Sequence, residues 1–116
     1  MTLLERLEIK HPILLAPMAG VSTPKLAAEV SNQGGLGSLG LGANTVEDAR
    51  QQILATQALT HRPFQVNFFC HQSLPLDPQV SAQWIQYLTP YFEKYHATVP
   101  TELKCIYPSF LDHDDY

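Results

Sequence analysis

Residues 11–24 of the chain read HPILLAPMAGVSTP. An apolar run of strand length, residues 13–16, leads into the tight turn Pro17-Met18-Ala19-Gly20. Thr23 then provides a helix N-cap, and Pro24 occupies the first helical position. The stretch therefore predicts a strand–loop–helix unit. Its loop carries so little side-chain bulk that the backbone can approach a flat ligand closely.

The same order of elements repeats further along the chain. After a helix that ends at Gly34-Gly35, residues 36–39 predict a second strand. A second helix begins at residues 44–48, where the spacing fits a capping box and acidic residues occupy the first turn. Residues 65–69 predict a third strand. Strands that alternate with helices at short loop lengths indicate βαβ units and a parallel sheet, hence an α/β fold. The second helix is expected to present one apolar face, formed by Val46, Ala49, Ile53 and Leu59.

A proline-rich segment, residues 73–78, leads into another predicted helix. Pro90 should kink or restart this helix, with Thr89 as a new cap. Large side chains recur along it at helical spacing, and we interpret them as packing residues rather than as a cofactor site. They are Val80, Trp84, Leu88, Tyr91 and Tyr95.

Composition excludes several classes of function. The 116 residues are 45% hydrophobic and 16% charged, which is typical of a globular protein. The net charge is −4 and the seven Lys and Arg are scattered, so we expect no nucleic-acid partner. The longest apolar stretch, residues 13–18, is far shorter than the about 20 residues that span a bilayer. Cys70 and Cys105 lack metal-ligand spacing, and the N-terminus lacks an export signal, so we expect a cytoplasmic protein with reduced thiols.

Residues 35–40, GLGSLG, match the G-x-G-x-x-G pattern of dinucleotide-binding folds. In that fold the glycines follow a strand and open a helix directly. Here a helix precedes them, and the predicted strand runs through them. We therefore reject NAD(P) binding here and assign the glycines to tight packing or close approach of a ligand.

The Pro17-Met18-Ala19-Gly20 turn is the first candidate binding element. It lies at the C-terminal end of a predicted parallel strand, where free backbone N–H groups could bond a ring and Met18 could pack on its face. The alternative is a tight turn with Met18 in the core.

Asn67 is the second candidate, because an amide among Val66, Phe68 and Phe69 needs hydrogen-bond partners. The alternative is an Asn bonded to nearby backbone at a strand end. His71 and Cys70 receive no catalytic role. The residues define no catalytic group and no metal site.

These segments resemble one known family. The opening through Pro17-Met18-Ala19-Gly20, the Val66–Phe69 strand and residues 107–110, YPSF, resemble the nitronate monooxygenases (2-nitropropane dioxygenases), FMN enzymes built on a TIM (β/α)8 barrel. The resemblance implies that Pro17, Met18, Ala19 and Gly20 line the isoalloxazine ring and that Asn67 contacts the flavin. Because such a barrel takes about 250 residues, residues 1–116 are interpreted as the N-terminal part of one FMN-binding domain, with three βα units of an incomplete barrel.

The resemblance implies oxidation of alkyl nitronates, such as propionate 3-nitronate, with O2 to carbonyl compounds and nitrite. The family's catalytic base and phosphate-binding loops lie beyond this chain. We therefore expect the isolated chain to be inactive, with open sheet edges that favour self-association or docking to the missing barrel part. Two alternatives remain. One is a related FMN-dependent enoyl-acyl carrier protein reductase. The other is a non-catalytic remnant of a frameshift or split gene, which the acidic run at residues 112–115 with no helix after it favours.

Overall fold

The structure is a computed structural model that describes residues 1–107 and 109–112. The chain divides into two compact units. The first contains residues 1–71 and the described part of 107–116, and the second contains residues 72–106. The first unit contains α1 (Leu3–Leu7), α2 (Pro24–Asn32), β1 (Gly37–Gly40), α3 (Val46–Leu59), β2 (Phe64–Asn67) and the 3-10 helix η1 (Phe110–Asp112). The second unit contains α4 (Pro78–Lys94). The acidic run beyond Asp112 lies outside the described residues.

The expected helix starts of the first unit are confirmed. Thr23 Oγ1 accepts a hydrogen bond from the Leu26 N–H at 3.2 Å, and Pro24 occupies the first turn of α2. Thr45 Oγ1 accepts from the Asp48 N–H at 3.2 Å and begins α3. The end of α2 is also as expected, because Gly34 adopts a positive φ of 91° directly after the helix.

β1 and β2 form a parallel pair in which Gly37 lies opposite Phe64 and Gly40 opposite Asn67. The predicted strand over residues 13–16 is reduced to one isolated parallel bridge, between Leu14 and Leu36. The Leu15 N–H donates to the Leu36 carbonyl at 2.9 Å. A parallel ladder would continue through the N–H of residue 17, two positions along, and proline has none. The first strand therefore stops where the turn begins.

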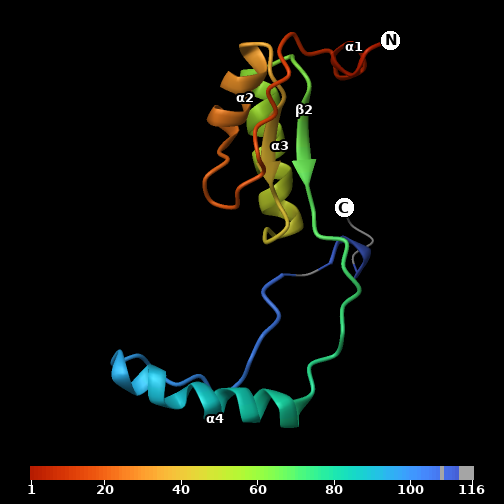
Figure 1. Ribbon diagram of the computed structural model, residues 1–116. Coiled ribbons are helices and arrows are strands. Elements are labelled where there is room, and N and C mark those ends of the chain that lie inside the picture. Colours follow the sequence, from red (N-terminus) through yellow and green to blue (C-terminus); the bar gives the residue numbers. More distant parts are fainter. Residues whose placement is uncertain (108, 113–116) are drawn as a thin grey trace. The chain divides into compact units, whose positions relative to one another are not determined.

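The core lies between the sheet and the helices α2 and α3, which stand side by side (Figure 1). It consists of Ala27, Leu39, Leu41 and Ala49, with partly buried neighbours around them. The prediction that Leu59 belongs to the apolar face of α3 is wrong, because its side chain is 52% exposed. Thr56 is buried instead, and its hydroxyl donates to the Gln52 carbonyl at 2.8 Å. A polar side chain thus enters the core because a bond within the helix satisfies it.

Gly37 allows α2 to approach β1 closely. A Cβ at this position would lie 2.0 Å from the Ala27 carbonyl oxygen. Ser31 of α2 accepts from the Gly37 N–H at 2.9 Å and donates to the Pro63 carbonyl at 2.8 Å. The strand does run through the glycine-rich segment, which confirms its structural interpretation.

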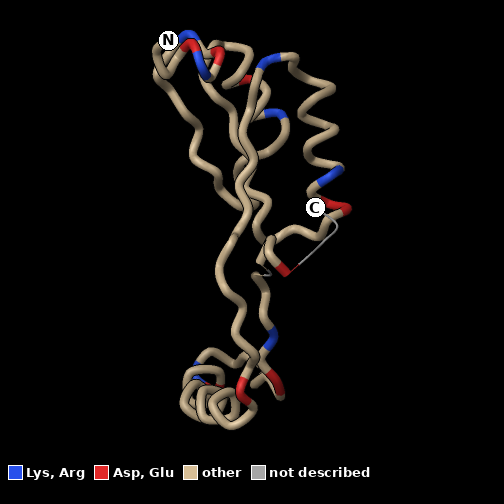
Figure 2. The backbone as a smooth tube through the Cα atoms, turned by 90° about the vertical axis from the view of Figure 1, so that its right-hand side faces the viewer, with Lys and Arg blue, Asp and Glu red and all other residues tan. Residues whose placement is uncertain are grey.

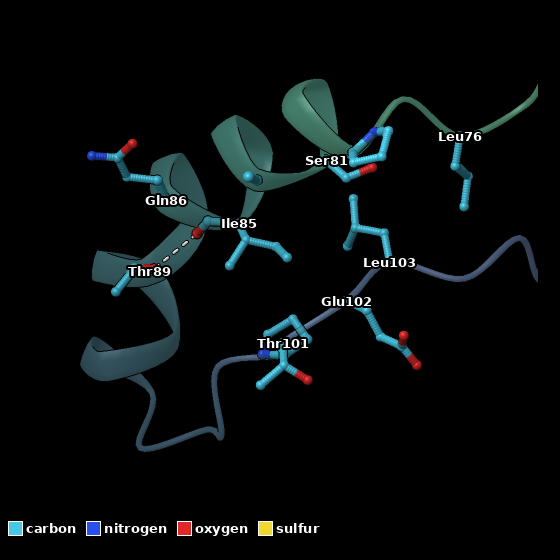
Figure 3. Close-up of a pocket in the computed structure, with 11 residues that line it drawn as sticks. Leu76, Ser81, Ile85, Gln86, Thr89, Thr101, Glu102 and Leu103 are labelled. Carbon is cyan, nitrogen blue, oxygen red and sulfur yellow. Dashed lines mark hydrogen bonds between the residues drawn. The ribbon is translucent and has the colours of Figure 1, made fainter.

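The second unit departs from two expectations. α4 does not restart at Pro90 but continues through it, and Thr89 is no cap, because its hydroxyl donates back to the Ile85 carbonyl at 2.8 Å. The aromatic side chains expected to pack are exposed: Trp84 and Tyr91 are each 53% exposed and contact Tyr87. Ser81, Ile85 and Thr89 are among the α4 residues that line a groove together with residues 100–103 (Figure 3).

Two further features of the chain are the distribution of its charged residues and the hydropathy of its helices. Lys and Arg lie on several separate backbone segments rather than in one cluster (Figure 2). Among the residues that the structure describes, none of the helices has both the length and the apolar character needed to cross a membrane.

The contact between α2 and β1 yields a first prediction. Gly37→Ala should lower the free energy of unfolding by about 2 kcal/mol or more, because the new methyl group would overlap the Ala27 backbone. Urea unfolding followed by circular dichroism measures the change. Ser38→Ala is the matched control at the next residue. Its buried hydroxyl has no partner within the described residues, so its removal should leave stability unchanged or raise it. Equal losses in both variants would contradict the prediction.

Candidate functional site

The turn after the first strand has a defined geometry. The N–H groups of Val21 and Ser22 donate to the Met18 carbonyl at 3.0 and 2.8 Å. Gly20 has a φ of +74°, as the third residue of a type II turn requires. Residues other than glycine rarely adopt such a φ. No heavy atom lies within 4 Å of the position that a Gly20 Cβ would take. The turn is therefore open to space at Gly20.

Only part of the turn offers free donors. The Met18 N–H donates to Ser22 Oγ at 2.9 Å, and Pro17 has no N–H. The N–H groups of Ala19 and Gly20 have no hydrogen-bond partner within residues 1–107 and 109–112. Both residues are exposed. The expected free backbone donors are thus two consecutive amides. Met18 itself is 36% exposed, so the structure does not place it in the core.

Gly40 joins this turn to Asn67. A Cβ on Gly40 would lie 3.0 Å from the Ala19 nitrogen and 3.1 Å from the Met18 nitrogen. Asn67 lies opposite Gly40 in the sheet register, and its carbonyl accepts from the Leu41 N–H at 2.9 Å. The two candidate elements, 47 residues apart in the sequence at their closest, therefore both border one glycine.

The amide of Asn67 is available. Its side chain is exposed and makes no hydrogen bond to any described residue. The alternative in which this amide bonds nearby backbone is therefore not observed. An amide that can both donate and accept thus lies on the strand residue opposite Gly40, on which the turn packs.

The structure also brings an aromatic pair to the end of β2. Phe69 and Tyr107 meet edge to face, with ring centroids 5.5 Å apart. The Phe110 N–H donates to the Phe69 carbonyl at 2.6 Å. The Phe69 ring also lies against Gly42, where a Cβ would come within 2.7 Å of it. The glycine-rich run, which includes Gly40, is assigned from the sequence to tight packing or close approach of a ligand. Sequence reasoning missed the pairing of Phe69 with Tyr107, because nothing local links these two residues.

The site offers recognition rather than acid–base chemistry. His71 and Cys70, to which no catalytic role was given, are exposed, and the His71 ring lies 6.5 Å from that of Phe69. Of the residues described, no three His, Cys, Asp or Glu gather where they could hold a metal ion. Two N–H donors, one amide and a polarizable thioether suit a flat heteroaromatic ring with acceptor atoms.

A family model described as nitronate monooxygenase matches residues 1–107. The chain belongs to the nitronate monooxygenase family. The predicted family resemblance is therefore confirmed. The chain is 56% identical over 109 residues to a nitronate monooxygenase of Paraburkholderia phytofirmans, covering 94% of this chain and 30% of that protein. It is 48% identical over 106 residues to one of Pseudomonas aeruginosa, covering 91% and 30%. This family member thus spans 30% of the length of these relatives.

Solved structures of two other proteins are similar to this chain. The fold is similar to a nitroalkane oxidase from Streptomyces ansochromogenes, with a TM-score of 0.68 and 37% identity over 83% of this chain and 27% of that chain. It is also similar to FabK from Thermotoga maritima, with a TM-score of 0.54 and 36% identity over the same shares.

The contact at Gly40 yields a second prediction. Gly40→Ala should move the Ala19 and Gly20 backbone by a few tenths of an ångström, because its methyl group would press on the turn. The amide resonances of these two residues should therefore shift in a 1H–15N spectrum. Stability should fall by about 1 kcal/mol. Ser38→Ala, on the same strand, should leave the two resonances in place. Unshifted resonances in Gly40→Ala would contradict the proposed contact.

Proposed function

We propose that this chain forms the flavin-ring portion of an FMN-dependent nitronate monooxygenase. The reaction is the oxidation of alkyl nitronates, such as propionate 3-nitronate, with O2 to carbonyl compounds and nitrite. The observation that carries the proposal is the free Ala19 and Gly20 donor pair, in a turn that packs on Gly40, the residue opposite Asn67 in the sheet. This arrangement occurs in a chain that belongs to the nitronate monooxygenase family.

The residues present fit the ring of FMN. Isoalloxazine carries nitrogen and carbonyl acceptors along its edge, and Ala19 and Gly20 supply N–H donors without added side-chain bulk. Asn67 supplies an amide that can donate or accept. The exposed Met18 thioether would lie against the ring face, and Pro17 sets the start of the turn. When bound, FMN supplies the electron acceptance from the nitronate. The role of these residues is to bind and orient the ring.

The site is a part of a larger one in this proposal. Residues 1–116 would form the N-terminal part of one FMN-binding TIM-barrel domain, with three βα units. Within the described residues, β2 has one strand partner, and Ile13 and Leu14 are 61% and 51% exposed. Unpaired strand edges and exposed apolar side chains favour pairing with further strands. These could come from the rest of a barrel or from a second copy of the chain.

Flavin titration of the purified 116-residue chain tests ring binding. FMN fluorescence should change on binding, and Asn67→Ala should weaken the affinity about tenfold, because it removes the amide hydrogen bond. His71→Ala is the matched control, an exposed residue with no assigned role, and should bind as the parent chain does. The chain alone should show no nitronate-dependent oxygen uptake. Turnover by the chain alone, or equal affinity of the Asn67→Ala variant, would contradict this assignment.

A chimera tests the reaction. Here this chain replaces the matching segment of the Paraburkholderia phytofirmans relative, to which it is 56% identical. The chimera should bind FMN and consume O2 when a nitronate is added. Consumption of NAD(P)H in place of nitronate would instead support a flavin-dependent enoyl-acyl carrier protein reductase. A folded chimera that binds no flavin would support a non-catalytic remnant.

A further inference from the structure

The Ser22 hydroxyl makes two hydrogen bonds to the backbone around the candidate turn. It accepts from the Met18 N–H at 2.9 Å, and its O–H donates to the Ala16 carbonyl at 3.0 Å. The residue is only 5% exposed. One side chain thus bonds the backbone at both sides of Pro17, immediately before the two free amides.

This bond decides which amides remain available. It occupies the Met18 N–H, and the Met18 carbonyl is already taken by two later N–H groups. The chain just before the turn is held independently, because the Gln65 amide donates to the Leu15 carbonyl at 3.3 Å. With both flanks of Pro17 bonded, the N–H groups of Ala19 and Gly20 are the ones in the turn that remain without a partner among the described residues.

We propose that Ser22 is a positioning residue for flavin binding, a proposal that rests on the function proposed above. Its hydroxyl holds the turn so that Ala19 and Gly20, and not Met18, present N–H groups to the ring. The role requires a group that donates and accepts at once, which a hydroxyl does and a methyl group cannot. Loss of the hydroxyl leaves a part-buried N–H and a carbonyl without this partner, so the turn should rearrange.

Ser31 offers a matched control. It is a second buried serine of the same unit, 1% exposed, and its hydroxyl also makes one donated and one accepted bond, to Pro63 and Gly37. Ser31→Ala therefore removes one donated and one accepted bond, as Ser22→Ala does. The bonds lost in Ser31→Ala join α2 to Pro63 and Gly37 and not to the turn. Should Ser31→Ala fail to fold, Thr56→Ala takes its place, since Thr56 is fully buried and its hydroxyl bonds the Gln52 carbonyl.

The experiment compares Ser22→Ala, Ser22→Thr and Ser31→Ala in the 116-residue chain. FMN affinity is measured by fluorescence, stability by urea unfolding and exchange of the Met18 amide by NMR. Ser22→Ala should weaken FMN binding about tenfold more than Ser31→Ala does, the loss that about 1.4 kcal/mol produces. Ser22→Thr should restore binding, because it keeps the hydroxyl. The Met18 amide should exchange about tenfold faster in Ser22→Ala only.

Three results would overturn the proposal: unchanged FMN affinity in Ser22→Ala, equal losses in Ser22→Ala and Ser31→Ala, or no recovery in a folded Ser22→Thr. Failure of the parent chain to bind FMN would instead count against the proposed function. In that case the exchange rate of the Met18 amide still tests whether the Ser22 hydroxyl holds the turn. Unchanged protection of the Met18 amide in Ser22→Ala would show that the hydroxyl does not hold the turn.

Discussion

The close contact between α2 and β1 is the constraint on which the rest of the first unit depends. Because Gly37 has no side chain, the strand lies directly against the Ala27 backbone. Ser31 then joins the Gly37 N–H to the Pro63 carbonyl, so one hydroxyl of α2 holds the beginnings of both strands. This places Gly37 opposite Phe64. Since the register of a parallel pair is uniform, Gly40 must then lie opposite Asn67. A helix contact at one end of the strands thus determines the neighbours at the other end.

The two faces of β1 serve different purposes. Leu39 and Leu41 point toward the helices and form the core with Ala27 and Ala49. On the other face, Gly40 leaves room for the backbone of the turn at Met18 and Ala19. Side chains of successive strand residues alternate between faces, so one short strand can support the core and the candidate turn at once. Glycine is needed on both faces, because on each a backbone segment packs directly on the strand.

The candidate site is built mainly from backbone groups held by buried hydroxyls. Ser22 bonds the turn on both sides of Pro17, and the two amides without a partner among the described residues are those of Ala19 and Gly20. Such donors depend on chain geometry more than on side-chain identity. The chain that carries this candidate site belongs to the nitronate monooxygenase family and covers 30% of the length of its Paraburkholderia phytofirmans relative.

Sequence alone determined the features that depend on near neighbours. The helix starts at Thr23 and Thr45 follow from caps that bond residues three positions away, and the family resemblance follows from contiguous motifs. Tertiary structure decided the rest. The first strand shortens because Pro17 cannot continue a ladder with β1, and the aromatic residues of α4 remain exposed because nothing in their own unit covers them. The position of Asn67 opposite Gly40, on which the turn packs, depends on strand register. Here that register goes with contacts between segments far apart in the sequence, such as the bond from Ser31 to the Pro63 carbonyl.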